Sequence, residues 1–353
     1  MKEKVKYISI IIPVRNEEQR IEGTLNSIIS SNFPLDQIEV LIVDGNSEDS
    51  TLKIIKSYEN KILIKIIHNK LKFVSSSFNL ALNKSRGEII FRIDGHCEIE
   101  PDFLSRCIKL LNKKNIDIAG GCIETVSHGL IGNVIAVAQS SFFGVGGVRF
   151  RNSKSNKGSY VNTLAFGAHK REIFSEIGGY DEDMICNQDD DFNFRAIQAG
   201  KKIWLDPQIK TKYFSRTSYI KLFKQYFYYG YYKVRGIQKR RQIISIRHIV
   251  PSIYIISLII TIIGGHIFSN IWLSYSILVI YLFTNICASL FASKRIFDFP
   301  MLFISFWILH ISYGLGFIWG LIKFMFYWKN NKLKDTNFNK DIFVANSMII
   351  KDK

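Results

Sequence analysis

The sequence lacks the cysteine patterns of metal-binding and disulfide-linked domains. Its five cysteines are an odd number, and none of them forms a C-x-x-C pair. This argues against a structural zinc site and against a disulfide framework. We therefore expect small buried thiols in a reducing compartment. The residues concerned are Cys97, Cys107, Cys122, Cys186 and Cys287.

Long apolar runs are missing from the first two thirds of the chain. The early run at residues 7–14 is too short to cross a bilayer, and no small-residue cleavage site follows it, so we expect no signal peptide. Runs free of Lys, Arg, Asp and Glu occur later, at residues 249–268, 271–291 and 299–321. Each could cross a hydrocarbon core of about 30 Å. Buried core helices are the alternative, but three such runs with aromatic flanks are not typical of soluble proteins.

Acidic residues are nearly absent from residues 201–247, where thirteen lysines and arginines accompany one acid, Asp206. Much of the net charge of +17 therefore lies in this segment. Such a segment could meet nucleic acid, anionic lipid or substrate phosphates. Its position just before a membrane-length run favours lipid headgroups on the cytoplasmic side, so we expect no nucleic-acid partner. A solvated basic helix is the alternative.

Basic residues also indicate how the apolar runs are arranged. Residues 233–247 and the pair Lys294-Arg295 are basic, whereas the link 269–270 is not, which predicts a hairpin with its ends in the cytosol. A third crossing would place the basic tail, residues 329–353, outside. Either the third run re-enters the membrane, or residues 296–328 form a tight helical pair, or the charge rule fails here.

Apolar segments and helical patterns alternate through the first part of the chain. Short apolar segments occur at residues 8–14, 39–44, 62–68 and 88–94, and helical patterns occur between them at 17–31, 50–59 and 75–84. Strands that are apolar on both faces are typical of a parallel sheet covered by helices. The sequence therefore predicts an α/β fold with a mixed, mostly parallel sheet, and its strand ends should line a ligand crevice.

Polar residues follow three of these predicted strands. They are Arg15, Asn16 and Glu17 after the first, Asp44 after the second and Asp94 at the end of the fourth. A single carboxylate at such a position could instead cap a helix or form a turn. Asp94 and His96, two residues apart, could offer oxygen and nitrogen ligands to one Mg²⁺ or Mn²⁺.

A second acidic cluster, Asp189-Asp190-Asp191, follows Gln188. Adjacent carboxylates repel each other when ionised, so one of them could have a raised pKa suited to accepting a proton. The alternative is an acidic first helical turn stabilised by the helix dipole, without any catalysis.

Taken together, these motifs resemble the inverting family 2 glycosyltransferases, which have a nucleotide-sugar-binding (GT-A-like) fold. The segments ISIIIPVRNEE, VLIVDGNSEDST, GEIIFRIDGH, IGGYDED and NQDDDFNFRAIQAGKKIWLDP occur in this order over residues 6–210. The variants D-G-H and NQDDD, with FFGVGGVRFR and a late YGLGFIWG, are similar to succinoglycan-type exopolysaccharide glucosyltransferases.

The resemblance implies a donor site and a divalent cation, Mn²⁺ or Mg²⁺. The implied donor-binding residues are Pro13, Arg15, Glu17, Asp44, Asn79 and Asp94. Asp44 would contact the uracil or ribose, and Asp94 would bind the ribose and the metal. His96 stands where the family often has a second acid, and a neutral imidazole is also a competent Mn²⁺ ligand, so direct ligation is left open.

The resemblance also implies an acceptor side. Asp189 aligns with the family's general base, and Gln188 replaces the neighbouring Glu, which leaves Asp190 and Asp191 as substitutes. Arg149 and Arg151 could meet acceptor phosphates or belong to an ordinary surface loop. Gln225 stands where processive synthases carry Q-x-x-R-W, but the Arg and Trp are missing, which favours addition of a single sugar.

The expected function is transfer of one hexose, glucose from UDP-glucose, with inversion to a lipid-linked oligosaccharide in exopolysaccharide or cell-surface glycan synthesis. We expect a multi-pass protein of the inner (plasma) membrane with a cytosolic catalytic domain. The expected layout is a catalytic domain (1–215), a basic aromatic interfacial segment (216–247), a membrane region (248–328) of three or four helices, and a polar tail (329–353). A processive synthase, a glycolipid-forming transferase, and a non-catalytic membrane-anchored protein that binds polyanions are the alternatives.

Overall fold

The computed structural model describes residues 7–113, 115–151, 156–242, 246–327 and 338–348, which divide into two compact units. The first unit contains the described residues up to Glu124, those from 156 to Tyr213, and those from 338 onwards. The second contains residues 125–151 and the described residues from Phe214 to 327. Before the long apolar helices, the chain passes from the first unit to the second between Tyr213 and Phe214, and the expected domain layout stays a prediction. However, α13 (Lys340–Met348), which we expected to lie in a separate tail, belongs to the first unit.

The first unit is built on one mixed sheet with the strand order β3-β2-β1-β4-β8-β6-β9-β5, in which β7 pairs with β9. Its parallel part consists of β1 (Ile8–Val14), β2 (Ile38–Asp44), β3 (Ile64–His68) and β4 (Ile89–Arg92). Every residue of β1 and β2 is buried, which explains why both are apolar throughout. The predicted α/β fold is confirmed.

The other part of the sheet is antiparallel, so the sheet is mixed, as predicted, but it is not mostly parallel. The antiparallel part consists of β8 (Gly167–Lys170), β6 (Ile118–Val126), β9 (Ile203–Phe214), β5 (Cys97–Ile99) and β7 (Ser159–Tyr160). Along β9 the buried side chains mostly alternate with more exposed ones. That alternation is typical of an antiparallel strand with one solvated face, and it lacks the continuous apolar run of a parallel strand.

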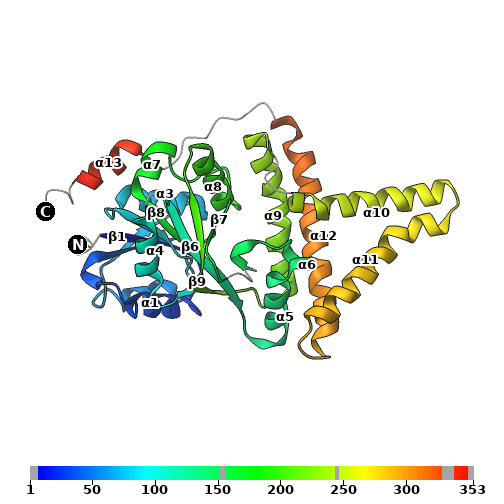
Figure 1. The fold of residues 1–353 in the computed structure, drawn as a ribbon, viewed down its shortest axis with the longest axis horizontal. Helices are drawn as coiled ribbons and strands as arrows, with labels where there is room; N and C mark the ends of the chain where they lie inside the picture. The colour runs from blue at the N-terminus through cyan, green and yellow to red at the C-terminus, as the bar shows by residue number, and fades with distance from the viewer. Residues whose placement is uncertain (1–6, 114, 152–155, 243–245, 328–337, 349–353) are drawn as a thin grey trace. The chain divides into compact units, whose positions relative to one another are not determined.

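Helices accompany the strands of the first unit. They are α1 (Ile21–Ile29), α2 (Thr51–Lys56), α3 (Val74–Lys84), α4 (Phe103–Leu111), α7 (Arg171–Ile177), α8 (Gln188–Gln198) and α13, with the short 3₁₀ helix η1 (Leu35–Gln37). The first three are the predicted helices, and α1 begins four residues later than expected. Figure 1 shows α13 beside α7, and α13 also packs against α3.

The second unit is helical. It contains α5 (Gly129–Ser140), α6 (Phe142–Val145), α9 (Tyr219–Arg240), α10 (Val250–Ile267), α11 (Ile271–Ala292) and α12 (Asp298–Phe324), with short 3₁₀ turns η2 (Arg149–Arg151), η3 (Ile246–His248) and η4 (Met325–Tyr327). Three of these helices, α10, α11 and α12, are long and apolar enough to cross a membrane by length and composition. The third predicted run is one continuous helix, so it is not a helical pair.

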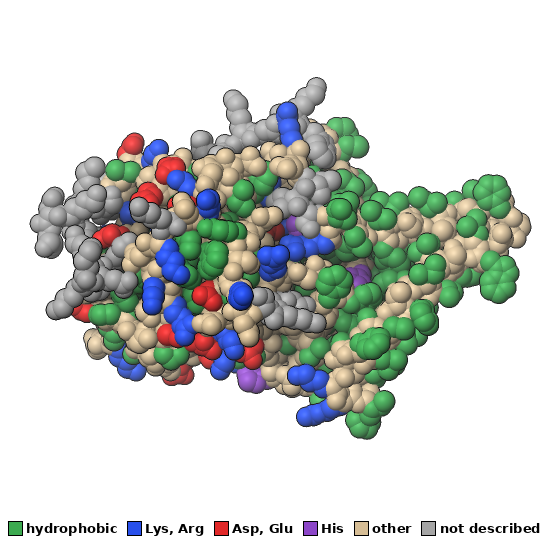
Figure 2. Space-filling model, in the orientation of Figure 1, with side chains coloured by type: hydrophobic (Ala, Val, Ile, Leu, Met, Phe, Trp, Pro, Cys, Tyr) green, Lys and Arg blue, Asp and Glu red, His purple; other side chains and the backbone are tan. Residues whose placement is uncertain are grey.

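The three long helices differ in their surroundings. Figure 1 shows α10 and α11 projecting as a hairpin, and Figure 2 shows apolar side chains covering it. By contrast, α12 packs along α9, and glycines allow this close approach. A methyl group at Gly316 would overlap the carbonyl oxygen of Phe227, and one at Gly230 would overlap that of Tyr313. The motif YGLGFIWG therefore has a packing role.

Among the described residues, none of the five cysteines forms a disulfide bond. Cys97 and Cys107 are buried, whereas Cys122, Cys186 and Cys287 are only partly buried. Burial raises the pKa of the Cys97 thiol. The prediction of buried thiols is therefore confirmed for two of the five.

Candidate functional site

The loops that follow β1 and β2 are hydrogen-bonded to each other. The backbone N–H of Asn16 donates to Ser47 Oγ at 3.0 Å, and Asn16 Oδ1 accepts from the N–H of Glu48 at 2.9 Å. The N–H of Glu17 donates to Thr51 Oγ1 at 2.8 Å. Asn16 adopts a left-handed conformation with φ of 55°, which asparagine tolerates better than most residues. The two loops thus form one preorganised edge at the carboxyl ends of the strands.

Asp44 ends β2 at this edge, with its side chain 1% exposed. Its carboxylate accepts the backbone N–H of Ser47 at 3.1 and 3.3 Å and lies 3.6 Å from His68 Nδ1. Asp44 therefore forms a turn, which was one of its two interpretations. Its contact with the nucleotide stays a prediction. Pro13 is buried within β1, whereas Arg15 is exposed in the following loop.

Asp94 lies just beyond β4, which ends two residues earlier than predicted. The following Gly95 approaches β1 closely, because a Cβ there would lie 2.9 Å from Val14 Cγ1. Thr24 Oγ1 donates to the Gly95 carbonyl at 3.0 Å. These contacts hold the Asp94-Gly95-His96 turn against the loop that follows β1.

His96 is oriented by Glu17. The distance from His96 Nδ1 to Glu17 Oε1 is 2.8 Å, and the imidazole ring packs edge-on against Tyr213. Because an ionised carboxylate can only accept a hydrogen bond, we assign the proton to Nδ1, which leaves Nε2 as the ligating atom. A carboxylate bonded to the other ring nitrogen is the usual support of a metal-binding histidine. Glu17 therefore orients His96, and its role in the nucleotide pocket stays a prediction.

Arg92, which sequence reasoning missed, connects the two acidic motifs. Its side chain is only 6% exposed, and its Nη2 and Nε atoms lie 3.2 and 3.3 Å from Asp94 Oδ1. Its Nη1 atom lies 3.9 Å from Asp189 Oδ2. Burial by itself disfavours the charge, but Asp94, Tyr180 and Asp189 outweigh it and raise the pKa of Arg92 above its ordinary value. The signal in the sequence was an arginine inside an otherwise apolar strand.

The three acids at the start of α8 have different partners. Asp191 pairs with Arg195 at 2.8 Å, four residues further along the helix, and Asp190 accepts from Thr163 Oγ1 at 2.7 Å. Asp189 is the one that approaches Arg92, and 27% of its side chain is exposed. Asn187 precedes the helix with φ of 60°. Of the three acids, Asp189 is therefore the best placed to act beside Asp94.

Asn79 is fully buried on α3, and its amide is held by the Tyr180 loop. Its Nδ2 donates to the Tyr180 carbonyl at 2.8 Å and to Glu182 Oε1 at 2.7 Å, while its Oδ1 accepts the Tyr180 N–H at 2.8 Å. Tyr180 in turn stacks on Phe78, and the Arg92 guanidinium lies 5.7 Å from the Tyr180 ring centroid. Asn79 therefore supports the surroundings of Arg92, and donor binding by its side chain stays a prediction that this placement does not favour.

The remaining candidate residues belong to the second unit. Arg151 Nη1 donates to Thr125 Oγ1 at 2.8 Å, and Arg149 lies in the same 3₁₀ turn. On α9, Gln225 Nε2 donates to the Tyr229 hydroxyl at 3.0 Å. Their contact with an acceptor stays a prediction.

Within the described residues, no three His, Cys, Asp or Glu side chains form a group that could hold a metal ion. The protein can offer Asp94 Oδ2, because Oδ1 bonds to Arg92, and Nε2 of His96, which Glu17 orients. Oxygen and imidazole ligands both suit Mn²⁺. Two protein ligands are enough for a cation that also binds the phosphates of a nucleotide and water.

The amino-acid sequence was compared with known protein families and known proteins. Residues 9–178 match the model of glycosyl transferase family 2. A dolichyl N-acetyl-α-D-glucosaminyl phosphate 3-β-D-2,3-diacetamido-2,3-dideoxy-β-D-glucuronosyltransferase of Methanococcus voltae is 30% identical over 270 residues, 74% of this chain and 83% of the relative. The succinoglycan biosynthesis protein ExoA of Rhizobium meliloti is 28% identical over 250 residues, 69% of this chain and 73% of the relative.

A solved structure is similar over most of the chain. The mannosyltransferase PcManGT from Pyrobaculum calidifontis, in complex with GDP-Man and Mn²⁺, superposes with a TM-score of 0.57 at 16% identity, covering 90% of this chain and 88% of that one. At this identity the likeness supports the fold alone, and it confirms the GT-A-like prediction. The sequence matches show that the chain is an enzyme of glycosyl transferase family 2.

Proposed function

We propose that this enzyme transfers a single hexose from a nucleotide diphosphate sugar, with inversion, to a lipid-linked glycan at the cytosolic face of the inner membrane. The observation that carries the proposal is the bridge from Asp94 through Arg92 to Asp189. The bridge places a candidate general base beside a carboxylate at the carboxyl edge of a parallel sheet, where α/β proteins bind nucleotides.

The proposed reaction is one displacement. Asp189 takes the proton from the acceptor hydroxyl while that oxygen attacks the anomeric carbon, and the bond from this carbon to the diphosphate oxygen breaks on the opposite side. Asp94 and His96 would hold a divalent cation, which neutralises the charge of the leaving diphosphate. Glu17 keeps the imidazole in the ligating orientation. A positioned base and one in-line displacement give inversion.

The donor and acceptor are proposed from the relatives. The Methanococcus voltae relative transfers a modified glucuronosyl group to a dolichyl-phosphate-linked sugar, and the Rhizobium meliloti relative acts in succinoglycan biosynthesis. The first relative supports a lipid-linked acceptor, and the second supports a role in exopolysaccharide synthesis. UDP-glucose is the donor that the succinoglycan-type motifs favour, and the missing Arg and Trp after Gln225 favour one addition per acceptor over processive synthesis.

The proposal is tested by incubating the detergent-solubilised full chain with UDP-glucose, UDP-glucuronate, UDP-N-acetylglucosamine and GDP-mannose and a lipid-linked acceptor extract. We expect transfer from UDP-glucose, a product one sugar longer than the acceptor, loss of transfer on chelation, and recovery with Mn²⁺ or Mg²⁺. Activity indifferent to chelators would remove the cation from the proposal, and a ladder of products would favour a processive synthase. Salt-sensitive polyanion binding without use of any donor would contradict the proposal as a whole.

A further inference from the structure

The side of the membrane on which α13 lies follows from how this helix packs. Phe343 on α13 is completely buried, and the Arg171 guanidinium lies 3.7 Å from the centroid of its ring. Arg171 Nη2 donates to the Phe343 carbonyl at 2.6 Å, and the N–H of Asn339 donates to Asn83 Oδ1 at 2.9 Å. Helix α13 is thus packed onto the first unit, which is named the catalytic unit because it contains Asp94 and Asp189.

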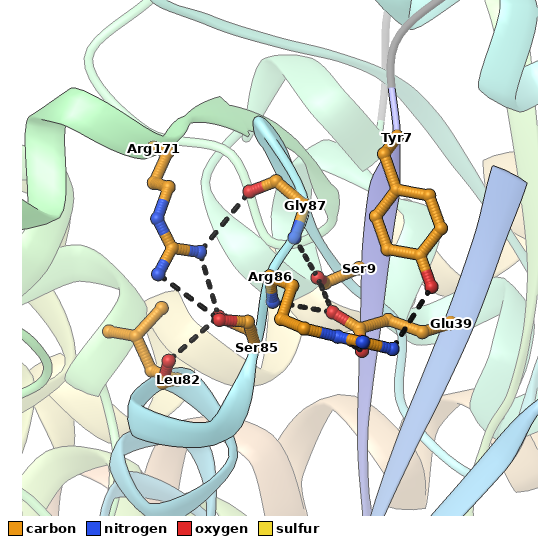
Figure 3. Close-up of polar contacts among 8 residues, drawn as sticks. All are labelled: Tyr7, Ser9, Glu39, Leu82, Ser85, Arg86, Gly87 and Arg171. Carbon is orange, nitrogen blue, oxygen red and sulfur yellow. Dashed lines mark hydrogen bonds and ion pairs between the residues drawn. The ribbon is translucent and has the colours of Figure 1, made fainter. Parts of the chain in front are cut away.

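Arg171 is itself an integral part of that unit. Figure 3 shows its guanidinium bonded to Ser85 and Gly87, at distances of 3.1 to 3.2 Å, beside the buried network of Ser9 and Glu39. Burial lowers the pKa of Arg171 to about 10, so the side chain remains charged at neutral pH and needs hydrogen-bond acceptors. The Phe343 carbonyl supplies one of them. Because this contact cannot reach through a bilayer, α13 and the catalytic unit lie on the same side of the membrane.

The direction of α12 gives a second, independent constraint. Tyr219 at the start of α9 donates to the carbonyl of Met301 near the start of α12, and Gln238 near the end of α9 donates to the carbonyl of Phe324 at the end of α12. With Gly316 against Phe227 between them, the two helices run parallel along their whole length. Both helices must therefore either cross the membrane or lie along its surface.

The composition of α9 indicates which of these two orientations the helices adopt. The helix carries six lysines and arginines and no acid, and Lys221 and Lys224 are exposed. Central lysines and arginines make a crossing helix unfavourable, whereas a basic helix with aromatic residues suits the headgroup level. If α9 lies at that level, its parallel partner α12 lies there too.

We propose that α10 and α11 are the helices that cross the bilayer, and that α12 lies beside α9 at the headgroup level on the catalytic side. This arrangement gives two crossings, so α12 begins and ends on the side where α13 is packed. It resolves the conflict that three crossings would create with the basic tail. The partner surface is an anionic membrane, whose headgroups complement the basic segment that contains α9.

Several features of the second unit agree with this arrangement. In the apolar stretch of 18 residues in α12, 44% of the residues are buried within the protein, against 17% in α10 and in α11. A smaller part of α12 is therefore left to be covered by lipid. Lys294 and Arg295 precede α12 and Lys323 lies in its last turn, whereas the Ser269-Asn270 tip of the hairpin is uncharged. Trp319 on α12 is 52% exposed, as expected for an aromatic side chain at the interface.

The test is the sidedness of single added cysteines in sealed membranes of cells that express the full chain. The exposed positions are Lys53→Cys on the catalytic unit, Ser269→Cys at the hairpin tip, Ile296→Cys before α12, Phe326→Cys after it and Asp341→Cys on α13. An impermeant maleimide is applied before and after permeabilisation, and the unaltered chain gives the background of the native thiols.

We expect Ser269→Cys to react from one side, and the other four to react together from the opposite side. Reaction of Phe326→Cys and Asp341→Cys from the side of Ser269→Cys would overturn the proposal, because α12 would then cross. A second measurement leaves the fold unaltered: protease added to the side of the hairpin tip should spare a C-terminal epitope on the otherwise unchanged chain, and its loss would also overturn the proposal. Neither result depends on the proposed reaction.

Discussion

Replacement of Asp189 by asparagine is expected to lower turnover by about 10²- to 10⁴-fold, the usual contribution of a general base, while nucleotide binding stays nearly unchanged. The amide keeps the size of the carboxylate but cannot accept the proton of the acceptor hydroxyl. The measurement is the transfer rate at saturating donor, with UDP affinity determined by calorimetry on the same preparation.

Asp190→Asn is the matched control, because the two acids are neighbours in the first turn of α8 and differ mainly in their partners. An amide oxygen at position 190 can still accept from Thr163 Oγ1, which lies 2.7 Å from the present carboxylate. We expect Asp190→Asn to keep most of the activity. The assignment of the base would be wrong if Asp189→Asn kept normal turnover, or if Asp190→Asn lost as much activity as Asp189→Asn.

Replacement of Arg92 by methionine is expected to damage both stability and catalysis. The side chain is 6% exposed and interacts with two carboxylates, so its loss would leave Asp94 and Asp189 without their shared cation. Removing one partner of a buried ion pair typically costs about 3–5 kcal/mol. Urea unfolding measures the stability, and the transfer rate measured under folded conditions shows the effect on the site.

Two further variants separate charge from geometry. Arg92→Lys keeps the charge but not the planar group that reaches both carboxylates, so we expect it to recover part of the stability and little of the turnover. Arg86→Met removes an arginine that pairs with Glu39 at the other end of β4, with 44% of its side chain exposed, and should cost less. Equal losses for Arg92→Met and Arg86→Met would show that Arg92 has no special position in the site.

The parallel part of the fold could be predicted because it depends on a local pattern. Strands β1 and β2 are buried on both faces, so each appears in the sequence as an uninterrupted apolar run between turn residues. Helices α10, α11 and α12 were predictable for a similar reason, since each contains a long apolar run that is visible in the sequence. In each case, consecutive residues must be apolar, and this pattern is visible in the sequence.

The site depends on contacts between residues far apart in the sequence, which no local pattern reveals. Composition and spacing alone did not distinguish Asp189 from Asp190 and Asp191, and only the family resemblance singled out Asp189, because the difference lies in partners on other elements. Arg92 was missed because its role depends on α8 meeting the end of β4. The contact of the Glu17 carboxylate with His96 was not foreseen either, and its contact with the nucleotide stays a prediction.

The packing of α13 was also beyond the sequence. The helix is short, and the single completely buried aromatic residue, Phe343, gives no periodic signal. Its position is defined by Arg171, a buried cation that needs acceptors from another segment. Buried arginines such as Arg92 and Arg171 are therefore useful signs of long-range contacts in this protein.

The configuration of the transferred sugar tests the central claim most directly. The purified chain is supplied with UDP-glucose, whose sugar is α-linked, and with the lipid-linked acceptor, and the anomeric proton of the product is examined by NMR. Displacement assisted by one base predicts a β-linked glucose with a large coupling between H1 and H2. An α-linked product, or no transfer from any nucleotide sugar in the presence of Mn²⁺ or Mg²⁺, would contradict the proposed roles of Asp189, Arg92 and Asp94.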